Sequence, residues 1–233
     1  MKKLLFLSIG FILYSTVSHA QSGWAIGDKV AIGHSWTVGN RPDDVKRKFH
    51  PTFQIGRNAV YNFNDNVGLG FGTLFSTEGG TYKNKDVNAG HEHRANYIRV
   101  PVFASFNIGD ATSRIRPRVS VGPSVGFLVG GKSFMFDEKD RFFGSKTTKA
   151  MDTKIDAGVN TSLGFNVKIK EGIWLNHDIN YYHGLVEQTP NAGVAINHAT
   201  YTNRSLNMSM GFLINSQAMK GWKGKMHRGA KKW

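Results

Sequence analysis

The 233-residue sequence contains no cysteine, only six prolines, and 16 acidic residues against 30 lysines and arginines. The absence of cysteine excludes a disulfide scaffold, a cysteine zinc site, thiol catalysis and a lipid anchor on an N-terminal cysteine. The few prolines, with glycines that follow no three-residue repeat, exclude collagen. Hydrophobic residues make up 40% of the chain, too many for a disordered protein. The net charge of +14 leaves nucleic acid, a membrane surface or a basic tail as explanations.

Long apolar runs are also missing, because no stretch reaches the roughly 18 residues that indicate a transmembrane helix. A shorter apolar run covers residues 4–14, with Lys2 and Lys3 before it and the small residues Ser18 and Ala20 after it. This pattern is typical of a secretory signal peptide that is cleaved after Ala20. We therefore predict a signal peptide over residues 1–20, and export of the mature chain argues against nucleic acid as a partner.

Period-2 alternation of apolar and polar residues is present in its place, and it indicates β-strands. In the clearest segment, Leu206, Met208 and Met210 share one face, while Asn207 and Ser209 share the other. Eight segments of this kind have the length of a tilted strand that crosses a bilayer. They cover residues 28–38, 52–63, 67–75, 97–107, 117–129, 155–167, 173–183 and 205–214.

The connections between these segments alternate strictly between short and long. Short and long connections at opposite rims are typical of an up-and-down barrel. We predict an all-β fold, an eight-stranded antiparallel up-and-down transmembrane β-barrel over residues 21–215, with both termini on the short-turn, periplasmic side. The short connections are 64–66, 108–116 and 168–172, and the long ones are 39–48, 77–94, 130–152 and 185–202.

A soluble barrel with an apolar interior would show the same alternation, so the composition of the polar face decides between the two. That face is mostly glycine, serine and asparagine, which suit a narrow lumen better than a wet outer surface. The apolar face carries aromatic residues near strand ends, as interfacial girdles require. Closure also pairs every backbone group, which hydrocarbon demands. The sequence therefore favours an outer-membrane barrel surrounded by lipid.

Four motifs, in this order, resemble the PorT-type outer-membrane β-barrel family of Bacteroidetes, and the resemblance covers about residues 24–215. It implies an eight-stranded outer-membrane barrel, in a family whose members mostly have no assigned activity and whose namesake is implicated in type IX protein secretion. The motifs are Tyr97-Ile98-Arg99-Val100-Pro101-Val102, Gly122-Pro123-Ser124-Val125-Gly126-Phe127-Leu128, Asp156-Ala157-Gly158 and Tyr181-Tyr182-His183-Gly184-Leu185.

Four charged residues fall on the polar, inward face of the predicted strands: Arg99, Arg118, Asp156 and Asp178. Side chains just fill the interior of an eight-stranded barrel, and buried charges must pair. We predict a polar lumen network in which Arg99, near the loop end of its strand, pairs with Asp156. Such a network either stiffens the barrel or gates a narrow conduit.

Three polar residues, His34, Arg57 and His177, fall on the apolar, lipid-facing side. An arginine at the midplane of a membrane barrel costs about 2–4 kcal/mol. Either a bulge, a register change or a position near the interface relieves this cost at Arg57, or this side of the barrel contacts a partner protein.

Two histidine patterns raise metal or catalytic chemistry. His91-Glu92-His93 has the spacing of a metal pair, but it falls in a predicted loop without a third ligand, so we predict no metal and no other cofactor. His183 and Glu187 could serve a lipid-modifying enzyme, yet no recognisable nucleophile accompanies them. We therefore predict no catalytic residue.

The segment 216–233 is basic and contains no acidic residue. Basic residues interleaved with tryptophan suit anionic headgroups of the inner leaflet, whereas the alternative is a solvated tail. The candidate residues are Lys220, Trp222, Lys223, Lys225, Arg228, Lys231, Lys232 and Trp233.

The function that these features favour is non-enzymatic. We expect a structural or interaction protein of the outer membrane, with lipid and an envelope protein as candidate partners, as an accessory to secretion or envelope assembly. A lipid-modifying enzyme and a narrow solute channel are the alternatives.

Overall fold

The computed structural model describes residues 23–39, 44–85, 89–137, 139, 141–147, 153–189, 200–216 and 218. The predicted signal peptide 1–20 and the basic tail residues from Lys220 to Trp233 lie outside this range. Among the described residues, no helix has the length and apolar character needed to span a membrane.

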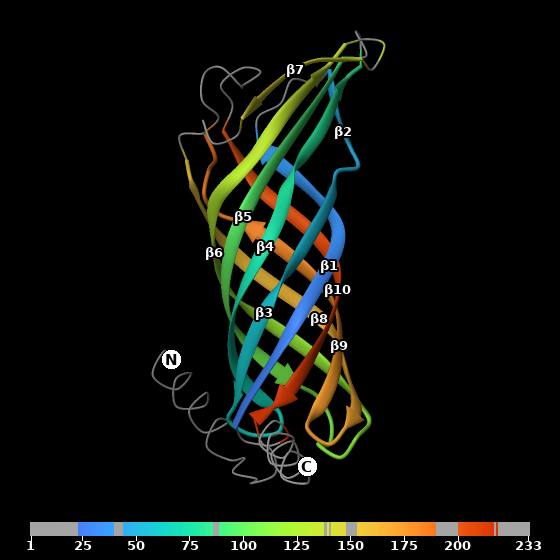
Figure 1. The fold of residues 1–233 in the computed structure, drawn as a ribbon, viewed down its shortest axis with the longest axis vertical. Helices are drawn as coiled ribbons and strands as arrows, with labels where there is room; N and C mark the ends of the chain where they lie inside the picture. The colour runs from blue at the N-terminus through green and yellow to red at the C-terminus, as the bar shows by residue number, and fades with distance from the viewer. Residues whose placement is uncertain are drawn as a thin grey trace, which may run out of the picture.

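Eight antiparallel strands close into a ring (Figure 1). The order around the ring is β1, β10, β9, β8, β6, β5, β4 and β3, and β3 pairs again with β1. The up-and-down barrel predicted from the sequence is therefore confirmed. Its strands are β1 (Gly23–Gly39), β3 (Pro51–Asn62), β4 (Val67–Asn84), β5 (Gly90–Asn107), β6 (Ile115–Phe136), β8 (Ile155–Lys170), β9 (Ile173–Gly184) and β10 (Tyr201–Asn215).

Two short strands extend the barrel at its upper end (Figure 1). β2 (Val45–Lys48) pairs with β4, and β7 (Phe142–Thr147) pairs with β6. Ala25 pairs with Asn215, so the first and last strands of the ring meet at the opposite rim. That rim also holds the short turns between β3 and β4, β5 and β6, and β8 and β9.

The long connections are not simple loops, which corrects the prediction for 77–94 and 130–152. β4 continues to Asn84, β5 already begins at Gly90, and β6 continues to Phe136. The sequence hides these extensions because both of their faces carry polar residues. Above the bilayer both faces of a strand meet polar surroundings, so the alternation stops although the pairing of the strands continues.

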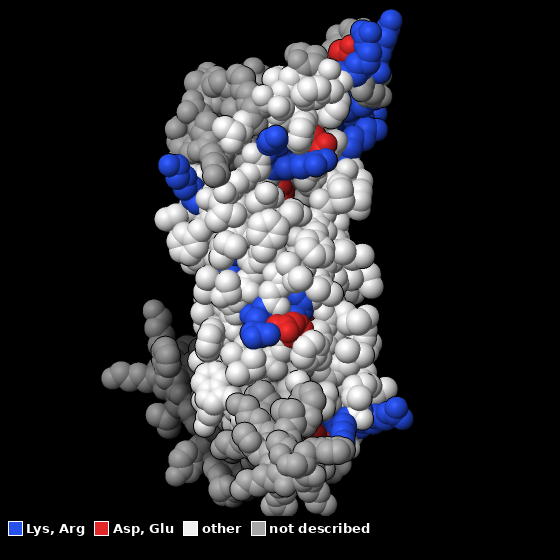
Figure 2. Space-filling model, in the orientation of Figure 1, with Lys and Arg blue, Asp and Glu red and all other residues white. Residues whose placement is uncertain are grey.

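The outer wall is apolar between two aromatic girdles. In the lower girdle the Trp24 ring centroid lies 5.3 Å from that of Tyr61, and in the upper girdle Trp36 lies 6.4 Å from Tyr181. Trp24 and Trp36 are twelve residues apart on β1, which for a tilted strand is a height of about 30 Å. Figure 2 shows the corresponding belt, nearly free of charge, between charged ends. Large apolar side chains such as Met208 are 70% exposed there, as expected for a surface in contact with lipid.

Candidate functional site

The lumen is the first candidate site, because most of the buried polar side chains point into it. Its upper cluster centres on Arg99, which is 2% exposed. Arg99 Nη2 donates to Glu78 Oε2 at 2.5 Å and to Asp156 Oδ2 at 2.6 Å, and Arg99 Nε donates to Glu78 Oε1. Asn203 Nδ2 donates to Asp156 Oδ2 at 3.0 Å. The guanidinium also lies 3.9 Å from the centroid of the Tyr182 ring. This cluster ties β4, β5, β8, β9 and β10 together across the barrel.

The predicted pairing of Arg99 with Asp156 is thus present, and two details differ from the prediction. Arg99 lies in the middle of the longer β5 and not near its loop end. Glu78 is a second carboxylate partner, which the sequence reasoning missed because residue 78 fell in a predicted loop. A usable signal was the continued alternation, since Gly72, Ser76 and Glu78 all occupy even positions that face the lumen.

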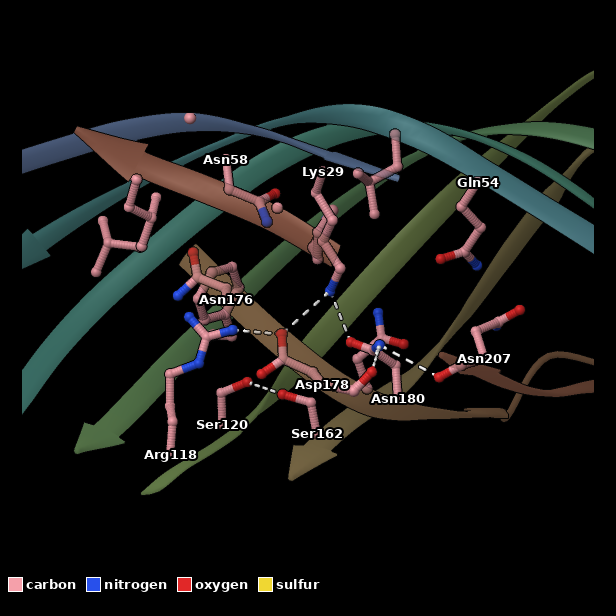
Figure 3. A pocket seen from close by; sticks show the side chains of 18 of the residues that line it. Lys29, Gln54, Asn58, Arg118, Ser120, Ser162, Asn176, Asp178, Asn180 and Asn207 are labelled. Atoms are coloured by element: carbon pink, nitrogen blue, oxygen red, sulfur yellow. Dashed lines mark hydrogen bonds and ion pairs between the residues drawn. The ribbon is translucent and has the colours of Figure 1, made fainter. Parts of the chain in front are cut away.

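The middle cluster centres on Asp178, and Figure 3 shows the side chains that converge on it. Arg118 Nη2 donates to Asp178 Oδ2. Lys29 Nζ lies 3.9 Å from the same oxygen and donates to Asn180 Oδ1 at 2.6 Å. Asn180 Nδ2 donates to Ser209 Oγ at 2.9 Å. Lys29 was not predicted, because the alternation of residues 28–38 is weak. Its odd position nevertheless places it on the lumen face of β1, whereas His34 at an even position lies on the outer face.

The formal charges of the two clusters balance. The upper cluster holds two carboxylates and one guanidinium, and the middle cluster holds one carboxylate and two cations. Both Arg99 and Arg118 line the same cavity, so the clusters face one another across it. Together the two clusters are therefore neutral while each cluster alone is not, which couples them electrostatically.

Little free space remains in the lumen between the upper cluster and the short turns. The cavity between the clusters has a volume of about 60 Å³, and a second one near Arg116 has about 50 Å³. Each volume suits only a few water molecules. At the lower end Arg116 Nη2 donates to Asn66 Oδ1 at 3.2 Å, and Asn166 Nδ2 donates to Asn107 Oδ1 at 2.7 Å. Interlocked side chains thus fill the barrel from its upper cluster to its turns.

The lipid-facing wall is the second candidate site. Arg57 points outward and makes a bidentate ion pair with Asp28, with Nε to Oδ1 at 2.6 Å and Nη2 to Oδ2 at 3.1 Å. The two side chains are 68% and 45% exposed. The pairing of β1 with β3 runs in continuous register past this point, so the alternative of a bulge or register change that turns Arg57 inward is wrong.

The height of this ion pair on the barrel argues against a position at the interface. Asp28 is four residues above Trp24 and eight below Trp36, a height of about 10 Å above the lower girdle. Figure 2 shows the blue and red atoms of an ion pair inside the white belt. A lone arginine at the midplane costs about 2–4 kcal/mol, and Asp28 offsets part of that cost by pairing.

The other two predicted residues also face outward. The His34 ring stacks on Phe49 with centroids 4.9 Å apart, and its Nδ1 accepts the backbone N–H of His50 at 3.0 Å. The His177 ring stacks on Phe165 with centroids 5.4 Å apart. Each of these histidines has an aromatic neighbour and lies on the side of the barrel that carries Arg57.

The His91-Glu92-His93 motif lies on β5 and not in a loop, which corrects that expectation. His93 Nδ1 contacts Ser133 Oγ at 2.9 Å, and its Nε2 contacts Tyr201 Oη at 2.8 Å, so both ring nitrogens are bonded. Burial lowers the pKa of His93 to about 3. Within the described ranges, no group of three histidine, aspartate or glutamate side chains could hold a metal.

The candidate enzyme residue His183 lies on the outer wall, where its Nδ1 is 3.3 Å from Tyr181 Oη. Ser133 and His93 are in contact, as a nucleophile and its base would be, but Ser133 is 2% exposed. The second ring nitrogen of His93 contacts Tyr201, whereas in a catalytic triad it contacts an acid. This arrangement holds the upper extension together, because it joins β5, β6 and β10.

Several solved outer-membrane proteins align with most of this chain. The crystal structure of OprG from Pseudomonas aeruginosa aligns with a TM-score of 0.55 and 13% identity, over 84% of this chain and 97% of that chain. Neisserial surface protein A aligns with a TM-score of 0.45 and 13% identity, over 84% and 99%. Outer membrane protein W of E. coli aligns with a TM-score of 0.43 and 14% identity, over 84% and 99%. No curated protein sequence matches the chain.

The family is shown by sequence. Residues 14–188 match the family model described as an outer membrane protein beta-barrel domain. The ring of eight strands and the likeness to OprG agree with that match at the level of fold. The chain belongs to the outer membrane protein beta-barrel domain family.

Proposed function

We propose that this protein is a non-enzymatic, non-conducting barrel of the outer membrane that acts through contacts on its outer surface. The observation that carries the proposal is the filled lumen. Two charge clusters cross it, and cavities of about 60 and 50 Å³ are too small to form a diffusion path. A role in solute passage would need both clusters to separate, and each separation would leave buried charges without partners.

The outer surface then carries the interactions. The proposed orientation puts the short turns, both termini and the basic tail in the periplasm, and the upper extension of β2, β4–β7 outside the cell. The lipid-facing residues His34, Arg57 and His177 lie on a wall that a protein partner could cover. The PorT-type motifs support a place for this barrel as an accessory of protein secretion or envelope assembly.

Conductance in planar lipid bilayers tests the closed lumen. The refolded protein is expected to show no unitary current at pH 7. The variant Arg99→Ala, which removes the cation of the upper cluster, is the positive control for a loosened lumen. Stable channel openings of the unsubstituted protein would overturn the proposal in favour of a narrow channel.

Affinity purification from native membranes tests the accessory role. A secretion or assembly component recovered in stoichiometric amount would support it, and an isolated barrel would contradict it. Mass spectra of lipid A from a deletion strain test the alternative of a lipid-modifying enzyme. Unchanged spectra are expected, and the loss of one acyl or headgroup modification would favour that enzyme.

A further inference from the structure

The ionisable side chains of the lipid-facing wall are distributed unevenly. Asp28, Arg57, His34 and His177 all lie on β9, β1 and β3, which β10 joins into one continuous face. On β4, β5, β6 and β8, the described outward side chains between the girdles are apolar or threonine. Examples are Phe71, Val102, Val121 and Leu163, which are 51%, 42%, 42% and 63% exposed. Lipid alone surrounds a barrel evenly, so it does not account for a polar half and an apolar half.

The Asp28–Arg57 ion pair is the most polar group of this face, and the pairing alone does not satisfy every hydrogen-bond donor of Arg57. Arg57 bonds Asp28 through Nε and Nη2, and no described residue accepts from its Nη1. Val30 and Ile55, at 45% and 46% exposure, flank the pair. Hydrocarbon offers neither a donor nor an acceptor, so a further polar contact at this depth would stabilise the pair.

The charge pattern of the pair complements itself. Asp28 on β1 lies opposite Arg57 on β3, so the two charges sit side by side on neighbouring strands, and Figure 2 shows red and blue atoms in contact within the white belt. A rotation of 180° about the membrane normal exchanges left and right, so it brings Asp28 of one copy toward Arg57 of the other. A twofold interface uses the same patch on both subunits, and this patch presents both charges to its own image.

We propose that the outer face of β9, β10, β1 and β3 binds a second copy of this chain, with Asp28 and Arg57 of the two copies forming a four-charge cluster in the membrane. Arg57 Nη1 donates to the carboxylate of the other copy, and Val30 and Ile55 surround the cluster. The inference deepens the proposed role of the outer wall, and it names the occupant of that wall.

Crosslinking tests the interface directly, because the chain has no cysteine of its own. Val30→Cys or Ile55→Cys places one thiol beside the ion pair, and Leu163→Cys places one on the opposite wall as the matched control. In lipid vesicles with excess lipid, a short bismaleimide is expected to give covalent dimers from positions 30 and 55 and none from position 163. Equal crosslinking from position 163 would overturn the proposal, since it would reflect random collision.

Charge variants in the Val30→Cys background test the role of the ion pair. The neutral double variant D28N/R57Q is expected to lower dimer formation tenfold or more. The swapped variant D28R/R57D keeps a self-complementary pair and is expected to retain it. Heat-modifiable gel migration verifies that each variant folds. Unchanged dimerisation in D28N/R57Q, or its loss in the folded swapped variant, would contradict the proposal.

A mixing experiment gives the sharpest outcome. D28R carries two cations and R57D carries two anions, so each is expected to stay monomeric alone while the mixture of the two crosslinks. If either variant does not fold, D28N/R57Q decides the question. A monomer at every lipid ratio would overturn the second copy as occupant, while the conductance result, and with it the closed lumen, would be unaffected.

Discussion

Replacement of Arg99 by methionine is expected to destabilise the folded barrel by about 3–5 kcal/mol. The guanidinium is 2% exposed and bonds Glu78 and Asp156, whose side chains are 2% and 0% exposed. At an effective dielectric constant of about 20, unit charges 4 Å apart attract by about 4 kcal/mol, so two carboxylates supply about 8 kcal/mol of gross attraction. Desolvation of the three ions offsets much of this. The loss of Arg99 is costly mainly because it leaves two carboxylates buried without their cation.

Urea unfolding of the refolded protein in detergent micelles at pH 7, followed by tryptophan fluorescence and gel migration, measures this loss. The triple variant E78Q/R99M/D156N removes all three charges and is the matched control. It is expected to regain at least half of the stability lost in R99M, because no buried charge remains unpaired. The reasoning would be refuted if R99M unfolded within about 1 kcal/mol of the unsubstituted protein, or if the triple variant were no more stable than R99M.

Three further predictions concern other parts of the chain. Burial lowers the pKa of His93 to about 3 from about 6.5 in the unfolded state, so the stability of the upper extension should fall by about 1.4 kcal/mol for each pH unit below pH 6.5. Hydrogen exchange of residues 77–96 at pH 7 and pH 4.5 should show this loss. The variant H93Q should remove most of the pH dependence. Gly122→Ala should destabilise the barrel by about 1–3 kcal/mol, since a Cβ there lies 2.0 Å from Val102 O; Gly144→Ala, 3.4 Å from Met135 Cε, should unfold at the same urea concentration as the unsubstituted protein. Truncation after Asn215 should leave gel migration of the folded barrel unchanged but reduce binding to anionic vesicles, and unaltered vesicle binding would argue for a tail that does not contact lipid.

The barrel itself was predictable from local pattern. Residues that cross a bilayer in a closed ring have lipid on one side and a packed lumen on the other, so every strand repeats the same period of two. That repetition predicted eight strands, their direction and the inward set that includes Arg99, Arg118, Asp156 and Asp178. The pairing of Arg99 with Asp156 followed as well, because a buried charge needs a partner and few were available.

The partners that the pattern could not assign depend on register between strands. Alternation tells which face a side chain takes, but the pairing of β1 with β3 decides that Arg57 meets Asp28, and the extension of β4 decides that Glu78 reaches Arg99. Above the membrane the alternation fades, because both faces of a strand meet polar surroundings, and only strand pairing defines the structure there. The sequence by itself therefore determined the class of the barrel and the polarity of its two faces. The tertiary structure decided which charges neutralise one another, because a shift of one residue between neighbouring strands would change every pair.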